Sequence, residues 1–242
     1  TVVSNAIKYG IPPEFLILIL LIAGVLIGII GVAVERLLRL VYDREEGFQL
    51  LLTFAIMLLL EDVIRLIWGA TPKTLGNLSM VYGQVAVAGI SLPVYKLLVI
   101  VASVTLALGL GWMLQKTNFG RIVRATAENR RMSEAVGVNV IWINVVIFTL
   151  GSILGTIGGA LVVPTSAASL EMISEVVVEA FAVVVIGGLG SMRGALVGAL
   201  IVGLMRAFAV HVYAELELLL IYLIVIAILI FKPNGLYGKA AE

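Results

Sequence analysis

Three acidic side chains recur at every fourth position of the sequence, at Glu171, Glu175 and Glu179. On a helix this spacing places them on one face, where like charges repel each other unless water surrounds them. The row is typical of a water-exposed helix start. The alternative is the acidic rim of a solute path, because acids inside a membrane usually face a cavity.

A second charged group, Glu61, Asp62 and Arg65, interrupts a long apolar run. Glu61 and Arg65 have the spacing of an ion pair within one helix, which would lower the cost of placing them in an apolar environment. We therefore expect the two to pair. Glu61 and Asp62 remain possible residues of a solute path.

Few residues could support catalysis. The sequence has no cysteine and a single histidine, His211, which excludes disulfides, thiolate metal sites, cysteine nucleophiles and histidine clusters. Residues 188–194 are rich in glycine but lack the Lys-Ser/Thr ending of a phosphate-binding P-loop. We expect no catalysis, metal or cofactor, and interpret His211 as a solvated residue at the membrane interface rather than a proton relay.

Residues 118–139 carry several charges within a stretch of largely helix-forming composition. Short amphipathic helices are expected at 122–127 and 132–136, and Gly137 should end the second. Such helices can seat in the groove of a partner protein. A plain surface loop that carries the usual excess of cytoplasmic positive charge explains the composition equally well.

Small residues recur every fourth position in three places, a spacing that lets helix backbones approach closely. The glycines concerned are Gly24, Gly28, Gly151, Gly155, Gly159, Gly190, Gly194 and Gly198. They indicate a tight bundle. The pattern does not decide between static packing and faces that slide during a functional cycle.

The elements that must carry these residues are membrane-spanning helices. Hydrophobic residues make up 62% of the chain and charged residues 13%, and the mean hydropathy is +1.17. A bilayer core requires about 20 helical residues. Suitable runs cover 14–34, 48–68, 94–115, 141–163 and 216–231, and two shorter helices should form a hairpin within 170–209 around the turn 187–194. The sequence predicts an all-α integral membrane protein, a polytopic bundle with about seven spanning or partly spanning helices.

The distribution of Lys and Arg predicts the orientation of these helices. Most basic residues fall at 35–47, 116–140, 188–194 and 232–242, whereas the alternate segments hold only Lys8 and Lys73. Positive charge favours the cytoplasmic side, so we expect the carboxyl terminus to be cytoplasmic and 69–93 to be external, with a β-like hairpin around 81–90. A net charge of +1 without a basic stripe gives no reason to expect a nucleic-acid partner.

Three stretches carry motifs that occur in the same order in one known family. The first has a Gly-x-x-x-Arg-Ala pattern followed by a small-residue glycine motif, with matches at Gly120, Arg124, Ala125, Glu134, Ala135 and Gly137. The others are residues 181–205 and the ending 232–238. Through them the chain resembles the branched-chain amino-acid permeases of ABC transporters. That family begins with further helices and an Asn-Phe-Ala-His-Gly stretch not found here, so we expect N-terminal helices to be missing.

The resemblance implies one permease domain over 1–242 in the inner (plasma) membrane of a prokaryote, importing leucine, isoleucine or valine without catalysing a reaction. It implies two ATP-binding subunits that dock on the loop 116–140, a second permease subunit that is identical or homologous, and an extracytoplasmic substrate-binding protein. Arg121 joins the matched residues in the docking loop. The alternatives are an ABC permease for urea, amides or sugars, and an ion-coupled secondary transporter supported by Glu61 and Asp62.

Overall fold

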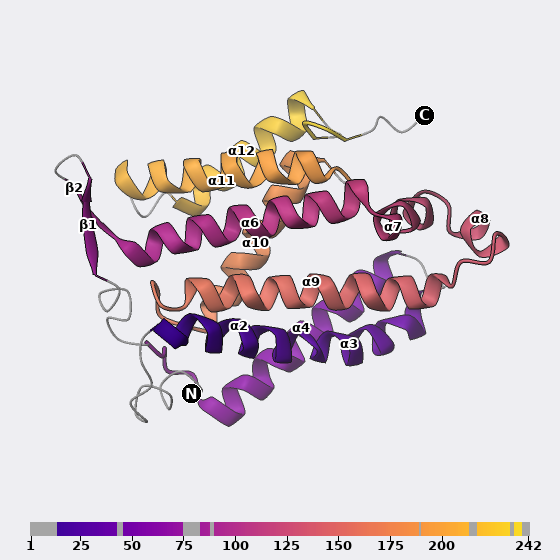
Figure 1. Ribbon diagram of the computed structural model, residues 1–242, viewed down its shortest axis with the longest axis horizontal. Coiled ribbons are helices and arrows are strands. Elements are labelled where there is room, and N and C mark those ends of the chain that lie inside the picture. Colours follow the sequence, from indigo (N-terminus) through magenta and orange to yellow (C-terminus); the bar gives the residue numbers. More distant parts are fainter. Residues whose placement is uncertain are drawn as a thin grey trace. The chain divides into compact units, whose positions relative to one another are not determined.

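The computed structural model describes residues 14–42, 46–74, 83–87, 90–188, 190–212, 217–232 and 235–238. These residues are predominantly helical, which confirms the predicted all-α class (Figure 1). The chain forms two compact units, Thr1–Ser169 and Leu170–Glu242, and each is described by itself. Lys8 and residues 75–82 of the expected external loop lie outside the described part.

The first unit contains the helices expected from the three long N-terminal apolar runs and from 141–163. Its elements are α2 (Glu14–Gly28), α3 (Ile30–Leu38), the 3-10 helix η1 (Arg39–Val41), α4 (Glu46–Trp68), β1 (Gln84–Val87), β2 (Ile90–Pro93), α6 (Val94–Lys116), α7 (Asn118–Glu128), α8 (Arg130–Ala135) and α9 (Val140–Val162). The run expected at 14–34 is interrupted at Ile29, and its second part continues to Leu38.

Helices α2 and α3 pack closely along α9 (Figure 1). A Cβ atom added to Gly28 would lie 2.5 Å from the Cα of Ile153, and one added to Gly24 would lie 3.2 Å from the Ile157 side chain. Thr156 of α9 donates a hydrogen bond of 2.6 Å to the carbonyl of Gly24. Because Gly24 and Gly28 have no side chain, the backbone of α2 can lie directly against α9, as small-residue spacings allow in membrane bundles.

In the first unit, hydrogen bonds near the start of α6 and the end of α9 join segments that are far apart in sequence. The strands β1 and β2 form an antiparallel hairpin in which Val85 faces Leu92. The buried Tyr95, at the start of α6, donates a hydrogen bond of 2.8 Å to the carbonyl of Leu161 near the end of α9. Lys73 and Ala168 exchange two backbone hydrogen bonds of 2.9 Å. These bonds fix the loops that follow α4 and α9.

The second unit consists of α10 (Glu171–Gly187), α11 (Met192–Val212) and α12 (Glu217–Phe231). The first two form the expected hairpin, whose turn begins at Gly188 with a φ of 93° that suits glycine. A Cβ atom added to Gly187 or Gly194 would collide with the backbone of the other residue. Beyond this crossing lies a cluster of buried residues from all three helices, namely Ala182, Ile186, Val202 and Ile221.

The chain after α12 folds back onto the turn of this hairpin. Leu236 and Tyr237 donate backbone hydrogen bonds of 2.9 and 3.1 Å to the carbonyls of Ile186 and Gly187. A Cβ atom added to Gly235 would lie 2.5 Å from the Cα of Gly188. Two of the three stretches that carry the family resemblance therefore meet in space.

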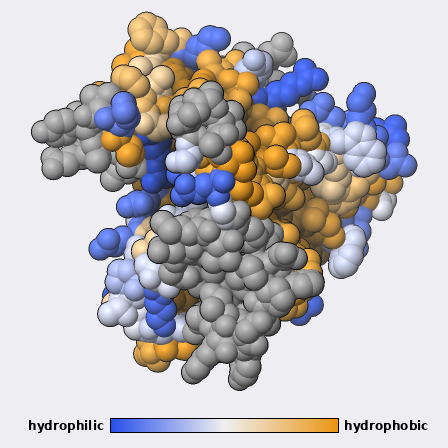
Figure 2. Space-filling model, turned by 60° about the vertical axis from the view of Figure 1, so that its left-hand side comes forward, coloured by the Kyte–Doolittle hydropathy of each residue, from blue (hydrophilic) through white to orange (hydrophobic). Residues whose placement is uncertain are grey.

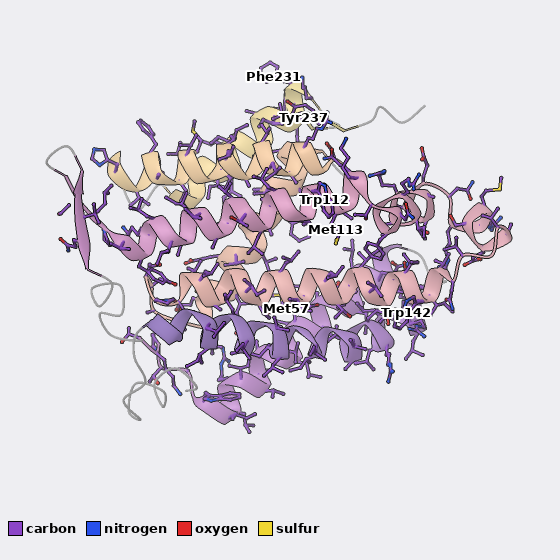
Figure 3. The ribbon with its side chains drawn as sticks, viewed as in Figure 1. Met57, Trp112, Met113, Trp142, Phe231 and Tyr237 are labelled. Carbon is purple, nitrogen blue, oxygen red and sulfur yellow. The ribbon has the colours of Figure 1, made fainter. Side chains whose placement is uncertain are left out.

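Helix composition makes this chain a multi-pass membrane protein. Within the described residues, four helical segments are long and apolar enough to cross a membrane: Leu21–Val41, Val94–Lys116, Val140–Val162 and Arg193–His211. Many large apolar side chains on these helices are exposed, and Figure 2 shows broad hydrophobic surface. Trp112 and Trp142 are exposed near the ends of α6 and α9 that lead into α7 and α8, as expected for aromatic residues at a membrane boundary (Figure 3).

Candidate functional site

The segment predicted to dock a partner is built from helices that begin at polar caps. Thr117 accepts a hydrogen bond of 3.2 Å from the amide of Gly120 and starts α7. Asn129 accepts one of 3.0 Å from Met132 and starts α8, and Asn139 accepts one of 3.0 Å from Trp142 and starts α9. Each side-chain cap is worth about 1 kcal/mol of helix stability. The three caps therefore fix where each helix begins.

Gly137 ends α8 in a defined turn rather than a flexible break. Its φ of 85° is left-handed, and its amide donates to the carbonyl of Glu134 at 3.0 Å. The amide of Val138 donates to Ser133, also at 3.0 Å. This pair of bonds is a Schellman motif, which satisfies the last carbonyls of a helix and requires a residue that tolerates positive φ. The turn sets the direction in which the chain enters α9.

Helix α7 is attached to the end of α6 by two of the residues predicted from sequence. Gly120 is buried, and a Cβ atom there would collide with the backbone of Leu114. Arg124 donates a side-chain hydrogen bond to the carbonyl of the same Leu114. Arg121 instead bonds Asn118 on the surface of α7. Gly120 and Arg124 thus fold α7 back on α6, with its amphipathic surface turned outward.

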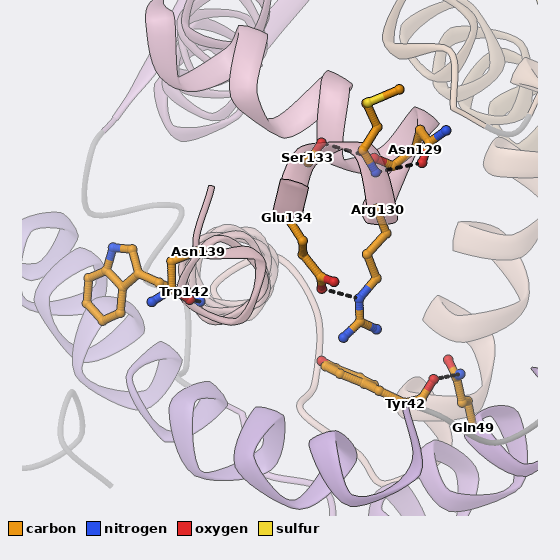
Figure 4. Close-up of polar contacts among 9 residues, drawn as sticks. Tyr42, Gln49, Asn129, Arg130, Ser133, Glu134, Asn139 and Trp142 are labelled. Carbon is orange, nitrogen blue, oxygen red and sulfur yellow. Dashed lines mark hydrogen bonds and ion pairs between the residues drawn. The ribbon is translucent and has the colours of Figure 1, made fainter. Parts of the chain in front are cut away.

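Arg130 of α8 points from that helix toward the end of η1. Its guanidinium Nε lies 3.0 Å from the carboxylate of Glu134, and the side chain extends toward Tyr42 (Figure 4). A pocket of about 350 Å3 lies at this junction. Its lining comes from η1's end, α4, α8 and α9, and consists of Tyr42, Gln49, Arg130, Asn144, Ile147 and Phe148.

Behind this pocket lies a fully buried acid, Glu35 of α3, whose exposed fraction is 0%. Its two carboxylate oxygens accept hydrogen bonds from Arg39 at 3.0 Å and from the Tyr42 hydroxyl at 3.4 Å. Tyr42 follows the apolar span. Desolvation by burial, with the Glu35 carboxylate beside it, raises the pKa of Tyr42 above its usual 10.0, against the opposing effect of Arg39 and Arg130. The hydroxyl is therefore a neutral hydrogen-bond donor at physiological pH.

The remaining residues of the segment form its outer surface. Ala125, Ala135 and Gly137 are exposed, and so are the apolar side chains of Met132 and Val136. Arg131 is exposed beside them. Apolar and basic groups together form the kind of helix surface that fits into a partner groove.

The acidic residues predicted from spacing lie in two different settings. Glu61 pairs with Arg65 at 3.2 Å as expected, and Asp62 lies 3.7 Å from the same guanidinium with 77% of its side chain exposed. Glu171 and Glu175 are exposed on α10, whereas Glu179 forms an ion pair with Arg206 of α11. A role for these five acids in a solute path stays a prediction.

The predicted glycine stripes also divide. Gly24, Gly28, Gly194 and Gly198 lie against a neighbouring helix, and an added Cβ on Gly198 would be 2.6 Å from the carbonyl of Val183. In contrast, Gly151, Gly155 and Gly159 have no atom within 4 Å of an added Cβ, and α9 uses its other side for α2 and α3. Gly190 has the positive φ of a turn residue. Packing by these four glycines stays a prediction.

Sequence reasoning missed the residues behind α8. Glu35 fell just beyond the expected span, although its spacing from Arg39 is that of a helical ion pair. Tyr42 and Asn144 gave no local signal, because their proximity depends on how α9 packs. The Glu179–Arg206 pair was missed for the same reason.

Comparison with known proteins identifies the family. Residues 1–229 match the family described as "Branched-chain amino acid transport system / permease component". The chain belongs to this family. It is therefore a transport subunit, as the motifs at 118–139, 181–205 and 232–238 indicated.

Relatives of this permease include transporters for different solutes. The high-affinity branched-chain amino acid transport permease BraD of Pseudomonas aeruginosa is 24% identical, with 86% of this chain and 70% of BraD covered. LivH of Escherichia coli K12, a permease with the same description, is also 24% identical, and the match covers 91% of this chain and 75% of LivH. The ribose import permease RbsC of Haemophilus influenzae is 28% identical and covers 80% and 60%. No solved structure matches the chain.

Proposed function

We infer that this chain is the permease subunit of an ATP-binding-cassette importer that moves branched-chain amino acids into a prokaryotic cell. The observation that carries the inference is the α7–α8 segment, whose capped helices join α6 to α9 and contact the pocket beside Glu35. Membership of the permease family and the names of BraD and LivH support the same substrate class.

The partners follow from this role. Two ATP-binding subunits would each seat a docking surface formed by α7 and α8, and a second permease would complete the path. An extracytoplasmic binding protein would deliver the solute. The α7–α8 segment would then face the cytoplasm, together with the carboxyl terminus and the hairpin turn at 188–194, in accord with the positive charge of these segments.

Force would pass from the ATPases to the spans through the rigid ends of the docking surface. Closure of the ATPases on nucleotide would displace α7 and α8. Gly120 and Arg124 would transfer this displacement to α6, and the Gly137 turn and the Asn139 cap would transfer it to α9. Packed helices of this kind move as rigid bodies and expose a path alternately to each side.

A second candidate solute class is a sugar, because RbsC and the fructose import permease FrcC of Rhizobium meliloti are also relatives. Urea and short amides remain further options, and an ion-coupled carrier would rely on Glu61 and Asp62. Competition of unlabelled leucine, ribose and urea for uptake separates the solutes, and dependence on ATP separates the driving forces.

The docking assignment is tested with Arg124→Glu and Gly137→Leu. Reversing the charge breaks the bond to Leu114, and a leucine at Gly137 adopts left-handed φ at a cost of about 1–2 kcal/mol. We expect both variants to reach the membrane at normal levels but to lose co-purifying ATPase or its coupling to uptake. Matched controls are Lys96→Glu, an exposed charge on α6, and Gly109→Leu, where an added Cβ atom meets nothing within 4 Å. Unchanged uptake and unchanged ATPase association in both test variants would refute the assignment.

A further inference from the structure

Two opposite charges meet across helices α10 and α11 of the second unit. A terminal guanidinium nitrogen of Arg206 pairs with a carboxylate oxygen of Glu179. Arg206 belongs to the apolar segment Arg193–His211 and lies between Val202 and Ala209, which are 6% and 1% exposed. The side chains of Arg206 and Glu179 keep 42% and 22% of their surface exposed. The hairpin therefore contains a partly exposed ion pair within an apolar membrane segment.

The hairpin is packed by several contacts other than this ion pair. Gly187, Gly194 and Gly198 already bring the two backbones into contact, and the cluster around Ile186 and Val202 fills the interface beyond them. Removing two charges from water is costly, and a buried ion pair is commonly no better for stability than apolar side chains of similar volume. Close packing of α10 and α11 alone therefore does not explain why this position carries two charges.

The exposed side of the pair is also poorly suited to lipid. A charged side chain at the bilayer centre costs about 2.5–3.5 kcal/mol even on the lowest scales, and ionisable residues inside membranes generally face a water-filled path or protein. Glu175 and Glu171 continue the same face of α10 toward its start, and both are exposed. The row thus leads from one end of the hairpin to the Glu179–Arg206 pair.

A cation and an anion side by side complement a zwitterion. An amino acid carries an ammonium and a carboxylate, whereas a neutral sugar carries neither. We propose that Glu179 and Arg206 form a transient binding site for zwitterionic solutes. In this site the Arg206–Glu179 ion pair opens, Arg206 binds the carboxylate of the solute, and Glu179 binds its ammonium group. Guanidinium and carboxylate groups form strong charge-assisted hydrogen bonds of this kind. The proposal rests on the importer role inferred above and gives it a residue basis for choosing amino acids over sugars.

The test uses cells of the source strain that lack this gene and are complemented with wild type, E179Q, R206Q or the double variant E179Q/R206Q. Uptake of labelled leucine and ribose is measured together with the amount of permease in the membrane. Lys96→Gln, which removes an exposed charge from α6, is the control. Each single change removes one charge of the Glu179–Arg206 pair, whereas the double change leaves two amides that can still bond each other.

We expect the double variant to reach the membrane at the wild-type level. Its maximal rate of leucine uptake should nevertheless fall about tenfold or more, as for the loss of hydrogen bonds to charged groups. If the pair had only a structural role, the neutral double variant would show both the wild-type amount of permease in the membrane and the wild-type rate of leucine uptake. Leucine uptake at the wild-type rate in E179Q/R206Q would overturn the proposal and leave the importer role intact. If wild type itself restores ribose but not leucine uptake, the amino-acid function fails and the zwitterion site with it.

Discussion

In the first unit, the buried carboxylate of Glu35 lies next to the hydroxyl of Tyr42. Glu35 is withdrawn from water, and Arg39 and Tyr42 supply hydrogen bonds in its place. A buried charge without such partners would be strongly destabilising. Because Tyr42 also lines the pocket that contains Arg130, the end of α3 is coupled to the position of α8.

Changing Tyr42→Phe should lower stability by about 1 kcal/mol, since it removes one donor to a charged group over a long 3.4 Å bond. The pKa of Tyr42 is raised above 10.0, so its contribution is complete below pH 10 and is lost as the pH rises through the raised value. Thermal unfolding in detergent, followed from pH 7 to pH 11, checks this. The gap between wild type and variant should be constant up to about pH 9.5 and shrink above pH 10. A gap that does not change with pH contradicts this role of the hydroxyl.

Residues were predictable from sequence where local spacing defines the contact. The Glu61–Arg65 pair and the helix stop at Gly137 both follow from positions within one turn of helix. Arg206 with Glu179, and Tyr42 with Arg130, come from different helices. Their contacts depend on how those helices pack, which spacing along one helix cannot determine.

Elements in this protein are held together by backbone contact where glycine permits it. The crossing of α10 and α11 is the clearest example, because Gly187 and Gly194 leave no room for a Cβ atom on either side. The apolar runs and the glycine-rich turn predicted this hairpin. They did not predict the break at Ile29, since the sequence around it is uniformly apolar and carries no Pro or charge.

Replacing Gly194→Leu should separate α10 from α11, because overpacking a tight contact costs about 1–3 kcal/mol and here the obstacle is backbone. We expect less folded permease after detergent extraction and a lower melting temperature. Gly203→Leu is the matched control on the same helix, where an added Cβ meets no atom within 4 Å. If the Gly194 variant is extracted as fully as the Gly203 variant and is as active, the hairpin does not rely on that crossing.

At the scale of the whole molecule, apolar helices alternate with basic segments, and this alternation predicts one orientation of the chain in the bilayer. The described spans Val94–Lys116 and Val140–Val162 place α7 and α8 between two membrane crossings, with an exposed tryptophan beside each junction. The positions and order of the long apolar helices could be predicted from hydropathy. Contacts between helices that are distant in sequence could not, because few sequence signals report them.

Sidedness can be measured directly, because the sequence contains no cysteine to interfere with labelling. A single cysteine at Ala127→Cys, on exposed α7, should react with a membrane-impermeant maleimide only after cells are permeabilised. One at Gln84→Cys, on β1, should react in intact cells. The positive-charge bias gives this orientation. Labelling of Ala127→Cys in intact cells would place α7 and α8 outside and remove the basis for an ATPase contact.

The close fit of α2 and α3 against α9 limits how the first unit can deform. Gly28 packs against Ile153, and Thr156 is hydrogen-bonded to the carbonyl of Gly24. Because of these contacts, we expect α9 not to slide or bend independently of α2. We therefore expect a displacement at Asn139 to move α2, α3 and α9 together as one rigid body. The other end of α9 carries the hydrogen bond between Tyr95 and Leu161. It lies roughly 30 Å from α8, the length of a helix of about 20 residues, so a small tilt of α9 near α8 would produce a larger displacement there.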